Sequence, residues 1–293
     1  MPYYELFARK FDTRDFELRH TLESAQPLTF HANYDGKAGT ATYSTYSNIV
    51  NIAFDGTSKK GVLTAVSRSQ SAIDEVYSRF RLMDNMRSIY KHIDTDAFMH
   101  EAIGKYYGMR VTLNDPWETM LCFIISQNNN VKRIRGITLK LIERFGQPIK
   151  DDSEKIVGRS FPSANTINRA SVRELMECGV GFRAKYIKDA AEKCTNNIDL
   201  WRLKAKPYEE IKDTLMEIDG IGDKVADCIA LMGYGKMEAF PIDTWSGRVL
   251  EKIYFKGRKQ KIERLHDFVY DKWGKYAGYA QQYLYWHGRQ SKI

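Results

Sequence analysis

Cysteine is scarce in this chain. The 293 residues include only four, at widely separated positions (Cys122, Cys178, Cys194 and Cys228). They form neither a CxxC pair nor the closely spaced quartet of an iron–sulfur site, so we predict buried free thiols and no iron–sulfur cluster. The six histidines show no ligand pattern such as HExxH, and we therefore expect no catalytic metal held by protein side chains.

Long apolar runs are also missing. No stretch approaches the roughly 20 apolar residues that a membrane span needs. The first residues mix charges of both signs with aromatics and lack the apolar core of a signal peptide. We therefore expect an intracellular protein with no membrane partner, in the cytoplasm or nucleoid of a prokaryote or the nucleus of a eukaryote. Neither a solenoid repeat nor a low-complexity segment is visible.

The bulk composition fits a globular protein with an anionic partner. Hydrophobic residues make up 43% of the chain, enough to fill the core of one large domain or two ordinary ones. The formal charge of +8 suits a polyanion, because cationic side chains gain affinity by releasing counterions from phosphates. Many basic proteins never bind nucleic acid, so the motifs have to decide.

The residue pattern changes near Ser69. From about Phe16 to Val66, small polar residues alternate with β-branched or aromatic ones, which indicates antiparallel strands. After Ser69, apolar residues recur every three or four positions, which indicates helices. We predict an α+β fold: a small N-terminal antiparallel β domain (residues 1–80), then a large all-α domain with two helical lobes (residues 81–293). The basic run at 256–261 is interpreted as a solvated loop rather than a phosphate contact, and receives no role.

Two helical patterns joined by the turn DGIG predict a helical hairpin over residues 208–235. Gly220 and Gly222, two positions apart, suggest a backbone that turns sharply and is closely approached. Free amides at the start of the second helix could bind a DNA phosphate without reading sequence. A plain interhelical turn is the alternative.

Lys224 lies at the start of the second helix. Because the helix dipole disfavours a cation there, we expect the pKa of Lys224 to be lowered, although Asp223 opposes this. A lowered pKa enlarges the nucleophilic fraction of the amine. Asp243 precedes another helical pattern and is predicted to be its N-cap, from where it could also orient an attacking amine. An ordinary surface lysine is the alternative for Lys224.

These motifs resemble the helix-hairpin-helix (HhH-GPD) base-excision glycosylases, and among them the 8-oxoguanine DNA glycosylase/AP lyases. The resemblance covers roughly residues 22 to 286 in matching order. The blocks that carry it are NDPWETMLCFIISQNNNVKRIRGI, GVGFRAKYI, DGIGDKVADCIALM, AFPIDTW and YAGYAQQYLYW. It implies double-stranded DNA with a damaged base as the partner, and extrusion of that nucleotide into a pocket. It also implies that Lys224 attacks the sugar C1′ to form a Schiff base that undergoes β-elimination, assisted by Asp243.

The resemblance assigns four residues to the damaged base, 8-oxoguanine opposite cytosine. Cys228 and Tyr285 match the two faces that sandwich the base, and Gln281 matches the amide that reads its Watson–Crick edge. Ala25 stands where the family usually has a glycine whose carbonyl reads the N7 hydrogen of the oxidised base. The extra methyl puts the preference for 8-oxoguanine over guanine in question.

Further positions match contacts to the DNA. Asn128 and Arg133, with Arg183, match residues around the orphaned partner base, and Phe182 matches the wedge that holds the kinked duplex open. Helix capping is the alternative for the asparagines, and core packing for Phe182. Trp245 stands where some members carry a phosphate-contacting histidine.

The resemblance also implies a monovalent cation at the hairpin, bound by the backbone carbonyls of Met216, Ile218 and Ile221. Asp219 replaces the usual hairpin proline there. We expect a monomer. Two alternatives remain: a glycosylase for an alkylated purine or oxidised pyrimidine on the same fold, and a non-catalytic helix-hairpin-helix protein that binds DNA nonspecifically.

Overall fold

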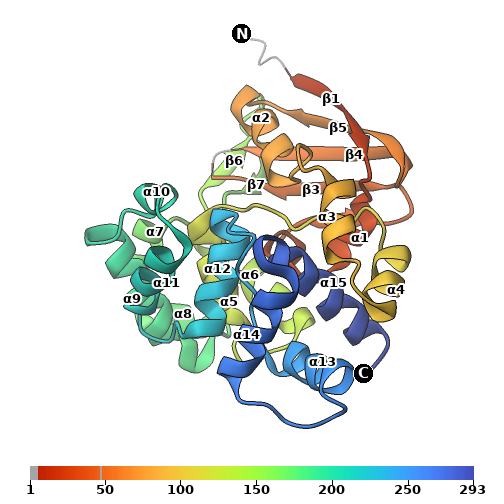
Figure 1. Cartoon of the computed structure of the whole chain (residues 1–293). Coiled ribbons are helices and arrows are strands. Elements are labelled where there is room, and N and C mark those ends of the chain that lie inside the picture. Colours follow the sequence, from red (N-terminus) through yellow and green to blue (C-terminus); the bar gives the residue numbers. More distant parts are fainter. Residues whose placement is uncertain (1–5, 47) are drawn as a thin grey trace.

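The structure is a computed structural model that describes residues 6–46 and 48–293. Its N-terminal part contains a five-stranded antiparallel sheet. The strand order is β1-β5-β4-β3-β2 (Figure 1). Alternate residues of strand β5, which lies between β1 and β4, are buried, and they pack with Ile73 and Val76 of helix α2 in one hydrophobic core. The elements are β1 (Phe7–Arg14), β2 (Asn33–Asp35), β3 (Thr40–Ser44), β4 (Ile49–Thr57), β5 (Lys60–Ser67) and α2 (Gln70–Arg79).

The predicted strand region is partly wrong. The first strand, β1, precedes Phe16 and was not predicted. Its first four residues are all at least partly exposed, so buried and exposed positions do not alternate there. Inside the region, Leu18–Glu23 forms helix α1 and Pro27–Phe30 forms the short 3-10 helix η1. Leu18 and Leu22 stand four residues apart and are both buried, which is helical rather than strand spacing.

Helices dominate after Ser69, as predicted, and the α+β class is confirmed. They are α3 (Met86–Ile93), α4 (Ala97–Lys105), α5 (Pro116–Ser126), α6 (Val131–Phe145), α7 (Ala164–Arg169), α8 (Val172–Glu177), α9 (Ala184–Asn196), α10 (Leu200–Leu203), α11 (Tyr208–Met216), α12 (Asp223–Tyr234), α13 (Thr244–Tyr254), α14 (Ile262–Trp273) and α15 (Ala277–Gln290), with 3-10 turns η2 (Gly181–Arg183) and η3 (Gly274–Tyr276). One hairpin, β6 (Pro148–Lys150) and β7 (Ile156–Arg159), interrupts them. It was not predicted, because strands this short show no recognisable alternation.

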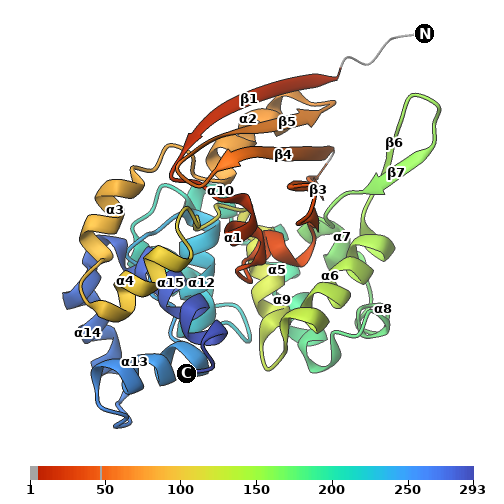
Figure 2. The ribbon, with the colours of Figure 1, turned by 90° about the vertical axis from the view of Figure 1, so that its right-hand side faces the viewer.

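Helices α5 and α12 form the centre of the helical part. They pack against each other, and both are buried on nearly every side, so they read as apolar all round. Figure 2 shows α3, α4 and α13–α15 on one side of this pair and α6–α9 on the other. The proposed domain boundary after residue 80 stays a prediction. Among the described helices, none is long and apolar enough to cross a membrane.

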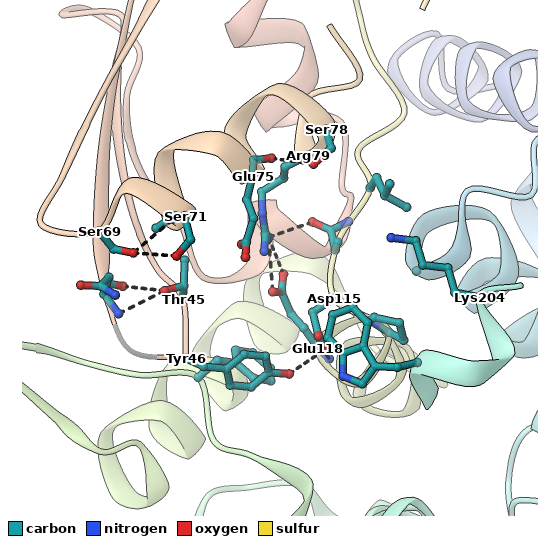
Figure 3. A pocket seen from close by; sticks show the side chains of 18 residues that line it. Thr45, Tyr46, Ser69, Ser71, Glu75, Ser78, Arg79, Asp115, Glu118 and Lys204 are labelled. Atoms are coloured by element: carbon teal, nitrogen blue, oxygen red, sulfur yellow. Dashed lines mark hydrogen bonds and ion pairs between the residues drawn. The ribbon is translucent and has the colours of Figure 1, made fainter. Parts of the chain in front are cut away.

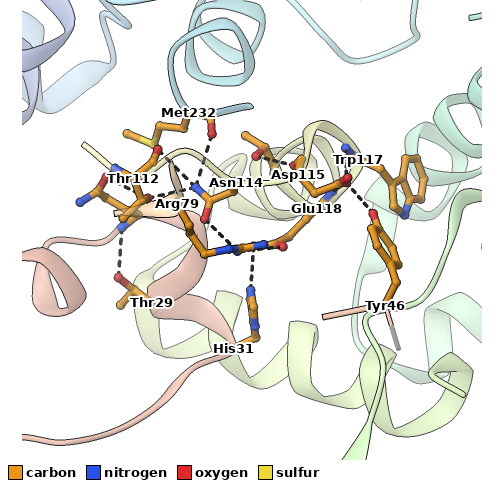
Figure 4. Close-up of polar contacts among 12 residues, drawn as sticks. Thr29, His31, Tyr46, Arg79, Thr112, Asn114, Asp115, Trp117, Glu118 and Met232 are labelled. Carbon is orange, nitrogen blue, oxygen red and sulfur yellow. Dashed lines mark hydrogen bonds and ion pairs between the residues drawn. The ribbon is translucent and has the colours of Figure 1, made fainter. Parts of the chain in front are cut away.

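A buried ionic network joins α2 and the end of η1 to α5 (Figure 4). The Arg79 guanidinium at the end of α2 donates to both carboxylate oxygens of Glu118, at 3.2 and 3.3 Å, and His31 Nε2 lies 2.8 Å from Glu118 Oε1. Asn114 Oδ1 accepts a further hydrogen bond from Arg79 at 3.3 Å. Burial alone raises the pKa of Glu118, but Arg79 and His31 outweigh it and lower that pKa to about 2. The carboxylate is therefore ionised and paired.

Candidate active site

The predicted hairpin is present, formed by α11, a turn at 217–222 and α12. Gly220 has φ +81°, and a Cβ there would lie 2.5 Å from the ring of Tyr186, so only glycine fits. A Cβ at Gly222 would meet no atom within 4 Å, which leaves the backbone open to approach. The amide of Gln127 donates to the Gly220 carbonyl at 3.0 Å and ties the turn to the end of α5.

Lys224 lies half-buried in the first turn of α12, with Nζ 5.2 Å from the ring centroid of Phe123. Burial pushes the pKa of Lys224 down, but Cys228, one helical turn on, and Asp243 outweigh it, and the net pKa is raised. The expected lowering is therefore wrong, because neighbours in space outweigh the helix dipole. Asp223 turns away and pairs with Lys212 at 3.2 Å.

Asp243 is the N-cap of α13, as predicted. Its Oδ1 accepts the Ser246 amide at 2.7 Å, and the Ser246 hydroxyl accepts the Asp243 amide at 2.8 Å, which forms a capping box. Among the described residues, Oδ2 has no hydrogen-bond partner. The cap therefore fixes the carboxylate and leaves one oxygen for a substrate.

A cavity of about 230 Å³ lies in front of Lys224. Segments far apart in the sequence meet around it, from the α1–η1 connection to the last helix. Seven of the predicted site residues line it: Ala25, Lys224, Cys228, Asp243, Trp245, Gln281 and Tyr285. The structure therefore brings the predicted catalytic and base-binding residues together, while their individual roles stay predictions.

Two of these residues give the cavity its polar character. Gln281 is buried, with 6% of its surface exposed, and its Oε1 has no hydrogen-bond partner among the described residues. A buried acceptor without a partner is costly, so this atom calls for a donor from a ligand. The thiol of Cys228 is neutral near pH 7, because burial raises its pKa to about 12 even though Lys224 lowers it.

Ala25 lies in the connection between α1 and η1. Its φ is +59°, in the left-handed region that favours glycine. The usual glycine of the family therefore has a physical reason in this backbone, and alanine adopts the same conformation at a cost.

The consecutive asparagines at positions 128–130 differ in their surroundings. Asn130 caps α6 by accepting the Arg133 amide at 3.0 Å, so the capping alternative applies to it. Asn128 does not cap: it is exposed and has φ +47°. The side chain of Arg133 is exposed as well and forms no ion pair within residues 6–46 and 48–293. Both side chains are accessible to DNA, and their predicted contacts remain untested.

Phe182 and Arg183 have opposite exposures. Phe182 is 55% exposed, so the core-packing alternative is wrong for it. Arg183 is only 2% exposed and donates to the carbonyls of Gln127 and Asn128. Its guanidinium also lies 4.4 Å from the Phe182 ring centroid. In this structure Arg183 supports the backbone around Asn128, and a direct contact to the partner base stays a prediction.

Several cavity residues were not predicted. Arg289 donates to the Tyr285 hydroxyl at 2.8 Å, and its spacing of four residues from Tyr285 on one helix could have revealed it. Phe123 and Ser126 come from α5, and no local signal marks them. The others are Phe30, Asn129, Asn130, Val131, Ile134, Met232, Pro241 and Gln282.

The hairpin carbonyls predicted to bind a cation lie at and just after the end of helix α11. The Ile218 carbonyl accepts the Ile221 amide at 3.0 Å, which leaves it one lone pair for a cation. Lys193 Nζ donates to the adjacent Glu217 carbonyl at 2.6 Å and already places a positive charge at the end of α11. A monovalent cation bound by the carbonyls of Met216, Ile218 and Ile221 stays a prediction.

A second cavity, of about 260 Å³, lies between α2, α10 and the start of α5 (Figure 3). Its buried charges pair with each other, Arg79 with Glu118, and the Tyr46 hydroxyl donates to Asp115 Oδ1 at 2.5 Å. Glu75, at its exposed rim, forms no salt bridge among the described residues. Lys204 also lines this cavity. No residue predicted for catalysis or base binding lies there.

Comparison with known proteins identifies the family. Two family models match the chain. The model of the 8-oxoguanine DNA glycosylase N-terminal domain matches residues 9–120, and the model of the HhH-GPD superfamily base excision DNA repair protein matches residues 121–270. The chain is 30% identical over 234 residues to a probable N-glycosylase/DNA lyase of Methanothermobacter thermautotrophicus, covering 73% of this chain and 74% of that protein. It is 32% identical over 240 residues to the N-glycosylase/DNA lyase of Saccharomyces cerevisiae, covering 70% of this chain and 64% of the yeast protein, just under two thirds of its length.

A solved structure agrees over the whole length. The 8-oxoguanine glycosylase/lyase of Clostridium acetobutylicum, in complex with double-stranded DNA containing cytosine opposite 8-oxoguanine, superposes with a TM-score of 0.86 at 26% identity, covering 99% of both chains. The sequence matches cover both parts of the chain and the fold agrees with a solved relative, so the chain belongs to the HhH-GPD superfamily of base excision DNA repair proteins.

Proposed function

We propose that this protein is a bifunctional DNA glycosylase/AP lyase that excises 8-oxoguanine opposite cytosine from double-stranded DNA. The observation that carries the proposal is one cavity that holds an amine (Lys224), a carboxylate with a free oxygen (Asp243) and an unpartnered buried acceptor (Gln281 Oε1). The similar proteins named N-glycosylase/DNA lyase and 8-oxoguanine glycosylase/lyase support it.

Base recognition follows from the cavity walls. A guanine-type base presents N–H donors at N1 and N2 on its Watson–Crick edge, which suits the Gln281 acceptor. Cys228 and Tyr285 supply flat or soft surfaces for the two faces of the extruded ring. The Tyr285 hydroxyl is fixed by Arg289, so this wall is held in place before the base arrives.

Excision requires a neutral amine. Because the pKa of Lys224 is raised, its ammonium has to lose a proton before attack, and the free oxygen of Asp243 is the proposed acceptor. The Lys224 nitrogen then bonds to C1′ as the bond from C1′ to the base breaks, and Asp243 stabilises positive charge on the sugar. The base leaves with its bonding electrons and takes up a proton.

Strand cleavage continues from the same lysine. Opening of the sugar ring gives a Schiff base between Lys224 and C1′, which acidifies the C2′ hydrogens. Loss of a C2′ proton expels the 3′ phosphate by β-elimination, and water releases the lysine. No step needs a metal ion or a redox partner. The enzyme is expected to act as a monomer, wherever the cell keeps its chromosomal DNA.

Borohydride trapping tests the proposal. The protein is incubated with borohydride and four duplexes that differ only in the base opposite 8-oxoguanine. A covalent complex is expected, most abundant opposite cytosine. Lys224→Gln is expected to lose the complex, and Asp243→Asn to slow excision while sparing binding. A trapped complex that persists in Lys224→Gln would show that Lys224 is not the nucleophile.

A further inference from the structure

Ala25, in the middle of the short segment Ser24–Gln26, forms part of the wall of the cavity of about 230 Å³ in front of Lys224, which we name the lesion cavity. Its φ is +59°, while Ser24 and Gln26 on either side are fully buried. A left-handed conformation costs an L-residue about 1–2 kcal/mol. Contacts with the rest of the fold must therefore hold this wall in place.

One side of the segment is anchored by Gln26. Its Nε2 donates to the Arg110 carbonyl at 2.8 Å, and its Oε1 accepts the Thr112 amide at 2.7 Å. Both partners lie in the connection that leads into α5. This anchor fixes the segment to the scaffold through side-chain hydrogen bonds to the backbone of that connection.

The other side is held by Gln282. Its Nε2 donates to the Ser24 carbonyl at 2.8 Å, and the side chain is 2% exposed. Gln282 directly follows Gln281 on α15, and consecutive helical residues point about 100° apart. One helix therefore carries both the unpartnered Oε1 of Gln281 and the tether to the Ser24–Gln26 segment, and Gln281 and Ala25 both line the cavity.

We propose that Gln282 is a positioning residue for selection of the damaged base: it sets the distance between the Ala25 wall and Gln281. The inference rests on the proposed glycosylase function and extends it to a residue that need not touch the substrate. A misplacement of about 1 Å in a site costs substantial rate. Loss of this tether affects steps that read the base and spares steps that do not.

Two rates separate these steps. Excision of 8-oxoguanine needs both the base and Lys224, whereas cleavage at a preformed abasic site needs Lys224 but no base. For Gln282→Leu, single-turnover excision is expected to fall about tenfold, the effect of one buried hydrogen bond, with abasic-site cleavage changed less than about twofold. The readout is the ratio of the two rates, which general damage to the fold does not move.

Gln127→Leu is the matched control. It is the same substitution and also removes an amide that donates to a backbone carbonyl, but that carbonyl belongs to Gly220 in the hairpin. Because the hairpin carries Lys224, both rates should change by the same factor and their ratio should stay constant.

A second variant guards against misfolding. Gln282→Asn keeps the amide and shortens its reach, and the ratio of excision to abasic-site cleavage is expected to fall about threefold. If both Gln282 variants leave the ratio at the wild-type value, the proposal is overturned. If the wild-type protein cleaves abasic sites but excises no 8-oxoguanine, the proposed function fails instead.

Discussion

The two cavities described above lie at opposite ends of α5 and differ little in volume. Phe123 and Ser126, near the end of the helix, line the lesion cavity, and Pro116 and Glu118, near its start, line the other. The helix has 11 residues and is therefore about 16 Å long. One helix thus presents two hollows of similar size to different surroundings.

Pairing of polar groups distinguishes the two cavities. In the second cavity, Arg79 and Glu118 neutralise each other and Tyr46 is bound to Asp115 (Figure 3). In the lesion cavity, Gln281 Oε1 has no partner and Lys224 has no salt bridge among the described residues. Paired groups stabilise the fold, and unpaired groups are available to a ligand. Volume alone does not separate these two uses.

The largest expected effect is a loss of activity on substitution of the lysine in the lesion cavity, but not of the lysine in the second cavity. Lys224→Gln should reduce excision and abasic-site cleavage by at least about a thousandfold, because it removes the nucleophile. Lys204→Gln, in the second cavity, should leave both rates unchanged. Single-turnover rates at saturating enzyme measure this. Loss of activity in Lys204→Gln would break the distinction between the cavities.

The buried pair of the second cavity should matter for stability instead. Glu118→Gln leaves the Arg79 charge uncompensated and is expected to lower the free energy of unfolding by about 3–5 kcal/mol. Glu75→Gln is the control: Glu75 lines the same cavity but forms no salt bridge within the described ranges, so a change below about 1 kcal/mol is expected. Urea unfolding measures both. A stable Glu118→Gln protein without activity would argue against a structural role.

The same carboxylate should make stability depend on pH. The pKa of Glu118 is lowered to about 2 in the folded protein. The contribution of Glu118 to the free energy of unfolding is therefore complete above the ordinary pKa of a glutamate and is lost as the pH falls towards 2. A single group contributes a slope of at most about 1.4 kcal/mol per pH unit. Between pH 5 and pH 2.5, the free energy of unfolding should therefore fall less steeply in Glu118→Gln than in wild type. Equal slopes would mean that Glu118 is not the group responsible.

The smallest expected effect lies at the wall of the lesion cavity. Ala25→Gly removes a methyl from a left-handed residue and should raise the free energy of unfolding by about 1 kcal/mol. Ala41→Gly, in strand β3, should lower it. Urea unfolding of the two variants measures the contrast. A competition assay across lesions with Ala25→Gly then tests whether this methyl affects lesion choice.

Much of the fold was predictable because it depends on neighbours in the chain. Apolar residues three and four apart mark the helices after Ser69, and the GIG turn marks the hairpin between α11 and α12. Asp243 was predictable as a cap for the same reason. Strand β1 and the β6–β7 hairpin were missed, since short or mostly exposed strands carry little alternation.

Sequence by itself determined the residue types that the chemistry needs, including Lys224, Asp243 and Gln281, together with the helices that carry them. Only the tertiary structure decided how they meet. The sign of the Lys224 pKa shift depends on Cys228 and Asp243. Arg183 is buried because it donates to the backbone at Gln127, and the segment at Ala25 is held by Gln282. Electrostatic and packing energies depend on distance through space, which local patterns along the chain do not encode.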